Sequence, residues 1–221
     1  MYGRKPQSGF RFSYNGIMEY GIREHALYYA LLAKAVLETD HLQDAETCLK
    51  HITEEYGRRR GARMRANAAA LCPADDLSAF FLTGEWAGKP GENQSELLRL
   101  SHTTESRVHV CAWYDTWRQY GLLSYGTYYC RWIDLAIAEG FDGSFTLAVP
   151  ETKGAGDSVC RFVWNQPVSA LKGERPYLLP FSFHIKELRC TAEEILRRTV
   201  PGHAEDILRR TETAFQEYLS S

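Results

Sequence analysis

The hydrophobic pattern changes once along the chain, and this change does most to limit the folds open to it. Before residue 88, apolar residues recur at intervals of three and four, as in "EHALYYALLAKAVLE" (24–38), which indicates helices. After "GKPGENQSE" (88–96), the run "LLRLSHTTESRVHVCAW" (97–113) alternates apolar and polar residues, which indicates a β-hairpin. We therefore predict an α+β fold, with helices first and a small twisted antiparallel sheet after them.

The length favours a single domain. At 221 residues the chain can bury a core that needs no disulfides. We expect an irregular N-terminal arm over residues 1–22 and one α+β domain over residues 23–221. Within that domain we expect a helical part (23–87), a core of sheet and helix (97–166) and amphipathic C-terminal helices (190–220).

More elements are predicted after the hairpin. Helical spacing indicates helices over 112–121 and 124–139, separated at Gly121, and one of them crosses the sheet. "SFTLAVPET" (144–152) and "SVCRFVW" (158–164) have the composition of strands joined by a glycine-rich turn.

Breaker and capping residues lead to three further expectations. Gly57 and Gly61 should interrupt an otherwise continuous helical pattern. Pro180 lies within "YLLPFSFHI" (177–185), which we predict as an edge strand. Thr191 is followed three residues later by a glutamate, the pattern of a capping box, so a helix should begin there.

Charge and cysteine usage limit the classes of function. The net charge of −2 gives no electrostatic reason to expect nucleic acid or a membrane as a partner. No apolar run is long enough for a signal peptide or a bilayer span, which favours a cytoplasmic location. Six cysteines are spread without any CxxC pair, which favours free thiols and excludes a zinc cluster of that type. We expect no cofactor, and a homodimer only because two-fold oligomers are frequent.

The stretch "GTYYCRWIDLAIAEGFDG" (126–143) has the pattern of a helix with one carboxylate in its apolar stripe. Asp134 follows Cys130 by four residues, so the two side chains share a face, about 5–6 Å apart at Cβ. A carboxylate there must be hydrogen-bonded, paired or protonated, because burying it bare is costly. The pair could share a substrate or pass a proton through one water. Alternatively, Asp134 caps a neighbouring loop and Cys130 packs as a small apolar residue.

Two other cysteines lie at places that favour chemistry. Cys111 follows a strand pattern and precedes a helix, where free backbone N–H groups lower the pKa of a thiol and can hold an oxyanion. Cys160 lies in a strand directly after "KGAGD" (153–157), a tight turn that lacks the Lys-Ser/Thr pair of a phosphate-binding loop. Both residues also fit the ordinary role of a structural cysteine.

The one dense basic run is "GRRRGARMR" (57–65). It is either a solvated helix face or an anion site, in which Arg60 or Arg63 grips a substrate carboxylate in bidentate fashion. His109 alternates with two valines, and His184 lies on the predicted edge strand. Neither histidine has a partner that the sequence reveals, so we base no catalytic dyad on them.

A spaced set of residues over about 50–165 resembles the L-2-amino-thiazoline-4-carboxylic acid hydrolase family. The set is Cys111-Ala-Trp-Tyr, Gly126-x-x-Tyr129-Cys130-x-x-x-Asp134, Gly140-Phe141, Thr152 and Gly156-x-x-x-Cys160-x-Phe162. The run "YGRRRGARMRANA" is also similar to the family's glycine- and arginine-rich helix. Family members often have Cys-Pro where this chain has Cys111-Ala112, and the resemblance does not extend past residue 165.

A more distant resemblance is to the 4-vinyl reductase (V4R) domain and to Bet3-like subunits of trafficking complexes. It implies helices packed on a twisted antiparallel sheet. Some V4R domains bind zinc through a cysteine eight residues before their last one. Thr152 stands at that position here, so we expect no metal.

The family resemblance implies the hydrolytic opening of a C–N bond in a small heterocycle, such as an aminothiazoline carboxylate, by hydration of C2. For this chemistry we expect Cys111 or Cys130 as nucleophile or thiol hydrogen-bond donor and Asp134 as general acid/base, with Cys160 in the same pocket. The residues expected to bind the substrate are Arg60, Arg63, Tyr129 and Thr152.

Two other functions remain open at this point. The same site could close or rearrange a heterocycle in a biosynthetic pathway, with tryptophans excluding water. A V4R-like domain that binds a small ligand without catalysis is the third possibility. Cysteines 111, 130 and 160 with no lowered pKa would favour this third function.

Overall fold

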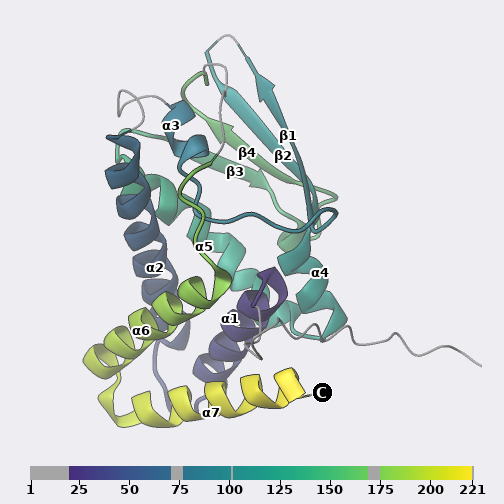
Figure 1. The fold of residues 1–221 in the computed structure, drawn as a ribbon. Coiled ribbons are helices and arrows are strands. Elements are labelled where there is room, and N and C mark those ends of the chain that lie inside the picture. Colours follow the sequence, from purple (N-terminus) through teal and green to yellow (C-terminus); the bar gives the residue numbers. More distant parts are fainter. Residues whose placement is uncertain (1–19, 71–76, 101, 169–174, 221) are drawn as a thin grey trace, which may run out of the picture.

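The computed structural model describes residues 20–70, 77–100, 102–168 and 175–220. In Figure 1 a four-stranded sheet occupies one end of the molecule and most of the helices form a layer beside and below it. The predicted α+β class is confirmed. The N-terminal arm expected over 1–22 lies almost entirely outside the described residues, as does Cys72.

Seven helices and four strands make up the described part. The helices are α1 (Ile22–Leu37), α2 (Ala45–Ala68), α3 (Leu77–Leu82), α4 (Ala112–Gln119), α5 (Leu123–Phe141), α6 (Phe181–Thr199) and α7 (Pro201–Ser220). The strands are β1 (Asn93–Arg99), β2 (Thr104–Cys111), β3 (Leu147–Glu151) and β4 (Cys160–Trp164), with a 3₁₀ turn, η1 (Lys153–Ala155), before β4. None of the helices in these ranges has the length and apolar character needed to cross a membrane.

The sheet is antiparallel throughout, in the order β1-β2-β4-β3. The hairpin predicted from the alternating pattern is β1–β2. Along the central pair, Val108 lies opposite Cys160 and Ser106 lies opposite Phe162. Because side chains alternate along a strand, these four residues share one face of the sheet.

Helices α2 and α5 pack against each other more closely than ordinary side chains would allow. A Cβ added at Gly57 would lie 2.6 Å from that of Ala136, and one added at Gly61 would lie 2.2 Å from the carbonyl oxygen of Ile137. The expected interruption at these two glycines is wrong, since α2 runs through both. Their missing side chains instead let the two helix backbones touch, which outweighs the modest helix propensity of glycine.

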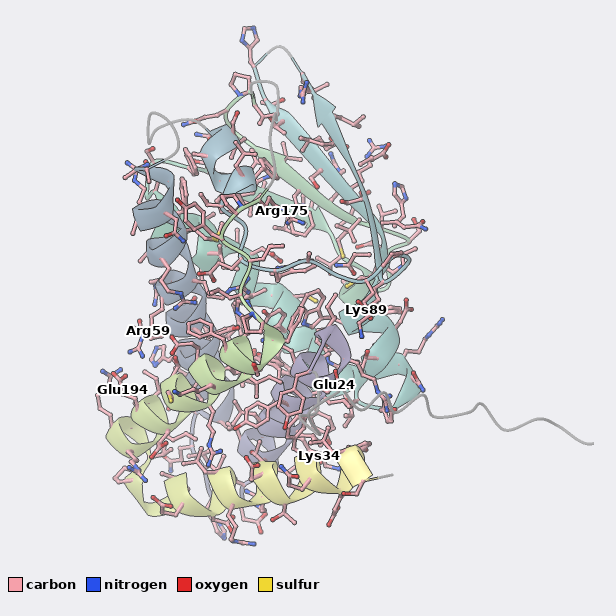
Figure 2. All side chains as sticks on the ribbon, viewed as in Figure 1. Glu24, Lys34, Arg59, Lys89, Arg175 and Glu194 are labelled. Atoms are coloured by element: carbon pink, nitrogen blue, oxygen red, sulfur yellow. The ribbon has the colours of Figure 1, made fainter. Side chains whose placement is uncertain are left out.

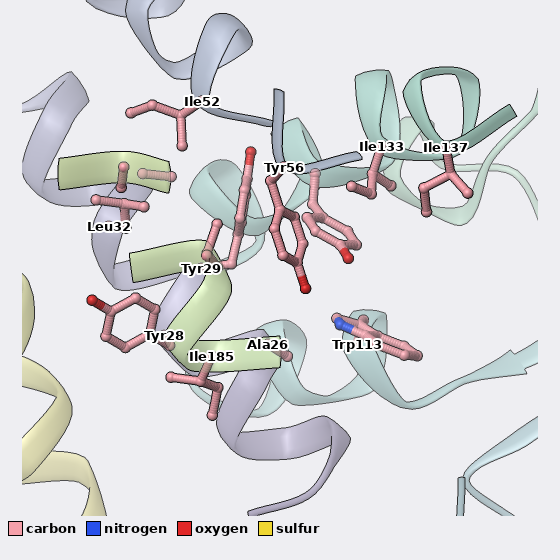
Figure 3. Packing of buried hydrophobic residues seen from close by; sticks show 14 of the residues in the cluster. Ala26, Tyr28, Tyr29, Leu32, Ile52, Tyr56, Trp113, Ile133, Ile137 and Ile185 are labelled. Carbon is pink, nitrogen blue, oxygen red and sulfur yellow. The ribbon is translucent and has the colours of Figure 1, made fainter. Parts of the chain in front are cut away.

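Helix α1 is the centre of the helical layer. Most of its residues are apolar and buried, including every residue from 26 to 33, which is typical of a helix surrounded by protein. Tyr28 meets Phe215 of α7 edge to face, with ring centroids 5.1 Å apart. On another side Tyr29 meets Tyr129 of α5 at 4.8 Å. Figure 3 shows this core, in which α1 lies between its neighbours.

The C-terminal region differs from the sequence expectation at two points. The predicted edge strand over 177–185 is wrong, because Pro180 is the N-cap of α6 and helix begins at Phe181. Proline fits a helix start, where its missing N–H is not needed. The capping box is also wrong: Thr191 lies inside α6, where its hydroxyl donates to the carbonyl of Glu187 at 2.8 Å.

Candidate functional site

A cavity of about 490 Å³ lies between one face of the sheet and helices α2, α3 and α5. The predicted site residues that line it are Arg60, Cys111, Tyr129, Cys130, Asp134, Thr152 and Cys160. Arg63 is the exception and lies outside the lining. The chain therefore brings together side chains from α2, α4, α5 and the sheet, which are far apart in sequence.

Asp134 is one of two carboxyls that line this cavity, with Glu85 as the other. Asp134 lies on α5, one turn after Cys130, where it is half-buried and lines the cavity. Burial raises its pKa to about 6, and the positive charge of Arg60 acts in the opposite direction. Near neutral pH such a carboxyl can both accept and return a proton, which is what acid–base catalysis needs.

Three thiols surround this carboxylate. Cys111 is the N-cap of α4, Cys130 is on α5, and Cys160 begins β4 and accepts a hydrogen bond from the backbone N–H of Lys153 at 3.4 Å. Burial raises the pKa of Cys111 to about 11, raises that of Cys130 well above its ordinary value, and also raises that of Cys160. All three are therefore neutral thiols at neutral pH.

The lowered pKa expected for Cys111 is wrong. Backbone N–H groups of Tyr114 and Trp113 do reach its sulfur, as a helix N-terminus predicts. Burial, together with the nearby Cys160 and Asp134, outweighs them. The sequence thus placed Cys111 correctly at a strand-to-helix junction, but it could not show how far distant segments shield the thiol from solvent.

Arg60 is the buried cation of the cavity. Its side chain is only 5% exposed, and Nε lies 3.4 Å from Oε2 of Glu85, whose side chain is fully buried. Burial works against the charge, yet Tyr56, Tyr129 and Glu85 raise the pKa of Arg60 above its usual value, so it stays protonated. Since its contacts with Glu85 and with the Tyr129 hydroxyl are both long, at 3.4 Å, a substrate anion can compete for its donors.

Arg63 does not line the cavity and instead forms ion pairs with Glu85 and Glu187. Its Nε donates to Glu85 at 2.9 Å and its Nη2 donates to the other oxygen of that carboxylate at 3.2 Å. Its Nη1 also donates to Glu187 of α6 at 3.1 Å. Arg63 therefore neutralises Glu85 in a bidentate pair, which leaves the charge of Arg60 available to the cavity.

A chain of hydrogen bonds fixes the position of the Tyr56 ring, which lies against the Arg60 guanidinium. The indole N–H of Trp113 donates to Nδ1 of His25 at 3.0 Å, so the proton of this neutral imidazole is on Nε2, which lies 3.1 Å from the Tyr56 hydroxyl. Burial lowers the pKa of His25 well below its usual value. The guanidinium of Arg60 lies over the Tyr56 ring, 5.6 Å from its centroid. Figure 3 shows Tyr56 and Trp113 pointing toward each other.

Tyr129 and Thr152 both line the cavity. The Tyr129 hydroxyl accepts a hydrogen bond from Arg60, and burial raises its pKa well above the usual value, so it is a neutral group. Thr152 is the N-cap of η1, and its hydroxyl accepts from the backbone N–H of Ala155 at 3.1 Å. That turn packs against α5 through Gly154 and Thr127.

Neither histidine considered in the sequence takes part in the cavity. His109 is exposed, and its Nε2 lies 3.1 Å from a carboxylate oxygen of Glu96 on β1. His184 is buried on α6, with Nε2 3.3 Å from the carbonyl oxygen of Glu85, and burial lowers its pKa to about 3. In the described ranges no group of three or more His, Cys, Asp or Glu residues has the arrangement of a metal site, and the absence of a metal stays a prediction.

Sequence reasoning missed the loop after α3. Gly84, Glu85 and Trp86 line the cavity, and so do Lys89 and Arg175 near its edge. Figure 2 shows Lys89 and Arg175 where the sheet meets the helical layer, with Arg175 donating to the carbonyl of Trp86 at 3.1 Å. The one available signal was the acidic residue of "GEW" in a region rich in aromatic residues.

Comparison with known families gives one match, between residues 20–164 and the model of the L-2-amino-thiazoline-4-carboxylic acid hydrolase family. This range is well over half of the chain, and it begins before the segment in which the spaced residues were recognised. No curated protein and no solved structure matches the chain. The more distant likeness to V4R and Bet3-like domains stays a prediction.

Proposed function

The chain belongs to the L-2-amino-thiazoline-4-carboxylic acid hydrolase family, and we propose that it hydrolyses a C–N bond in the ring of a small heterocycle such as an aminothiazoline carboxylate. The observation that carries this proposal is Asp134, a carboxyl with a pKa of about 6 in a cavity shared with the protonated Arg60. This arrangement supplies a base for water and a cation for the substrate carboxylate.

Arg60 would orient the substrate. A guanidinium donates to a carboxylate through parallel N–H groups, and this interaction is strongest where water is excluded. The hydrogen bonds from Trp113 to His25 and from His25 to Tyr56 hold the wall beneath the guanidinium in place. The substrate would then present the carbon between its two nitrogens and sulfur, C2, to Asp134.

The reaction follows from these positions. Asp134 takes a proton from water while the water oxygen bonds to C2. As the water oxygen attacks, the C2=N π pair moves to the ring nitrogen, which receives the first proton from Asp134. The resulting tetrahedral intermediate is a neighbour of Cys130 and Cys111, whose neutral S–H groups can donate to it. Asp134 then takes the hydroxyl proton of the intermediate as the C=O forms, the C2–N ring bond breaks with its electron pair on the ring nitrogen, and Asp134 returns this second proton there. One water is consumed, and the product is an open-chain carbamoyl compound with a free amine.

The thiols are better suited as donors than as nucleophiles. The attacking form of cysteine is the thiolate, and burial raises the pKa of all three cavity cysteines. A base at Asp134 removes the proton of water only as the water attacks, whereas a cysteine nucleophile would first have to form a thiolate that burial disfavours.

The test compares Asp134→Asn and Cys130→Ser with wild type, using 2-amino-thiazoline-4-carboxylate and chromatographic analysis of the product. We expect Asp134→Asn to lower kcat/KM by roughly 10²–10⁴. The surface change Asp115→Asn serves as the matched control and should leave the rate unchanged. Unaltered rates in both cavity variants, with circular dichroism showing a folded protein, would rule the proposal out.

The pH dependence sharpens this test. If Asp134 acts as the base, its protonated form is inactive, so kcat/KM should rise with pH through about 6 and level off above it. A fall across the same interval would make it the acid instead. Whether the product carries a free amine or a free thiol shows which ring bond breaks, because cleavage of C2–S would release a thiol.

A second function is favoured by the thiols themselves. Neutral cysteines at 111, 130 and 160, half-buried or buried, are also what a V4R-like domain would have if it bound a small ligand without catalysis. Titration with a thiol reagent, with and without substrate, separates the two. A ligand that protects all three thiols for hours without being converted would favour the binding function.

A further inference from the structure

We infer that the substrate carries a large apolar group, preferably an aromatic ring, on a ring carbon away from C2, and that the part of the cavity beyond Asp134 is its subsite. This rests on the proposed function, because it places C2 at Asp134. It makes a single-ring aminothiazoline carboxylate too small to be the preferred substrate.

The cavity is long in one direction. Its lining on α5 extends from Tyr129 to Ile137, and at about 1.5 Å per residue this is roughly 12 Å. On β4 the lining extends from Cys160 to Trp164, roughly 13 Å at about 3.3 Å per residue. A five-membered ring with its carboxylate and amino group fills only part of such a length.

The two ends of this cavity differ in chemistry. The end near the start of β4 holds the thiols and Thr152, with Asp134 and Arg60 next to them. Beyond Asp134 the lining residues share large apolar side chains, which we call the apolar end: Met64, Phe80, Phe81, Ile137, Leu147 and Trp164. If C2 of a substrate lies at Asp134 and its carboxylate lies at Arg60, any further substituent on its ring therefore lies in the apolar end.

Aromatic rings form the wall of the apolar end. The Phe80 and Trp164 rings have centroids 4.7 Å apart, and Phe81 meets Trp164 edge to face at 5.8 Å. An aromatic substituent gains both from burial of its apolar surface and from offset or edge-to-face contacts with such a wall. A cavity of about 490 Å³ also lies in the range of about 300–1,000 Å³ in which proteins hold drug-sized ligands.

The competition between two substrates tests the inference. Wild-type protein is given 2-amino-thiazoline-4-carboxylate and its 5-phenyl derivative, and kcat/KM is measured for each. We expect the phenyl compound to be preferred by roughly tenfold to a hundredfold. A preference for the unsubstituted compound, or equal rates, would overturn the inference and leave the hydrolase proposal standing.

A substitution that fills the apolar end tests whether the substituent binds there. Leu147→Trp adds an indole there, and the phenyl compound should then lose at least roughly tenfold in kcat/KM while the unsubstituted one changes by less than about threefold. Leu135→Trp is the matched control, since Leu135 is exposed on α5 and outside the lining. If Leu147→Trp does not fold, Phe80→Leu removes one aromatic face and should reduce the preference in the same direction.

A failure of the hydrolase proposal gives a different result. If neither compound is hydrolysed, calorimetry on the wild type still compares their binding. Tighter binding of the phenyl compound, lost in Leu147→Trp and kept in Leu135→Trp, would support the apolar subsite without catalysis. Binding that ignores the phenyl group would overturn it.

Discussion

Two faces of a single turn of α2 contrast the surface with the interior. Arg58 and Arg59 have side chains 39% and 34% exposed, and each forms ion pairs with glutamates in water. Arg59 reaches Glu194 of α6 at 2.7 Å, as the labelled pair in Figure 2 shows. The next residue, Arg60, is 5% exposed and faces the cavity. The three arginines are consecutive, yet only one lies where its charge is not screened by solvent.

The contrast shows that one basic run can provide both a solvated helix face and a buried cation for an anion site. Residues one apart on a helix point about 100° away from each other, so a run of three covers much of its circumference. The solvated arginines contribute little energy because water and salt screen their pairs. The buried arginine acts at low dielectric, where one charge changes both stability and the protonation of its neighbours.

The largest effect should come from removing the buried charge. We expect Arg60→Met to lower the free energy of unfolding by about 2–4 kcal/mol, because the buried Glu85 carboxylate and the Tyr129 hydroxyl each lose a donor, while Arg63 still pairs with Glu85. Urea unfolding measures this. Combining it with Glu85→Gln should restore part of the loss, and a double variant that is simply the sum of both losses would contradict the coupling.

Asp134 gives the next effect, and its sign depends on pH. Its folded pKa, about 6, is raised above the ordinary 3.8, so the folded state binds the proton more tightly and loses stability as pH rises between these values. Asp134→Asn lacks this penalty. The variant should be more stable than wild type by up to about 2–3 kcal/mol at pH 7.5, with the difference vanishing near pH 4. A difference independent of pH would show that burial does not raise this pKa.

The face of α2 that holds Arg60 in position should also be sensitive. Gly61→Ala places a Cβ against the backbone of α5, where no side chain can move aside, and we expect a loss of about 1–3 kcal/mol in unfolding free energy. Gly202→Ala in α7 has open space around it and should be neutral or slightly stabilising. Equal effects of the two changes would contradict the close packing of α2 and α5.

The smallest effect is expected on the solvated face. Arg59→Ala removes the pairs with Glu55 and Glu194, yet the melting temperature should fall by less than about 2 °C. That small difference should shrink further in 0.5 M salt. A large loss would mean that the surface pairs hold α2 and α6 together, and the contrast between the two faces would disappear.

Periodicity was enough for much of the fold. Alternation predicted the β1–β2 hairpin, and spacing of three and four predicted α4 and α5, because these patterns directly reflect which side of an element is buried. It failed where one residue type has two uses. Pro180 ends a strand or begins a helix with equal ease, and Gly61 breaks a helix or lets two helices touch.

The candidate site was predictable in its members but not in its electrostatics. The sequence indicated Asp134 because a carboxylate in the apolar stripe of a helix is costly to bury without a partner, and Cys130 lies one turn before it on the same face. That Arg60 enters the cavity while Arg63 pairs with Glu85 depends on how α2 is turned against α3 and α6, which one chain segment cannot reveal. The raised pKa of Cys111 likewise depends on segments distant in sequence.

The central position of α1 has a consequence for how the chain is made. Its apolar surface is completed by α7, where Phe215 covers Tyr28. During synthesis at about 5–20 residues per second, α1 leaves the ribosome on the order of ten seconds before its last cover exists. During this interval the apolar surface of α1 is exposed, so we expect chaperones that bind unfolded chains to bind it. Conditions that slow translation should therefore increase the aggregated fraction of this protein more than that of a protein whose core is completed early in synthesis.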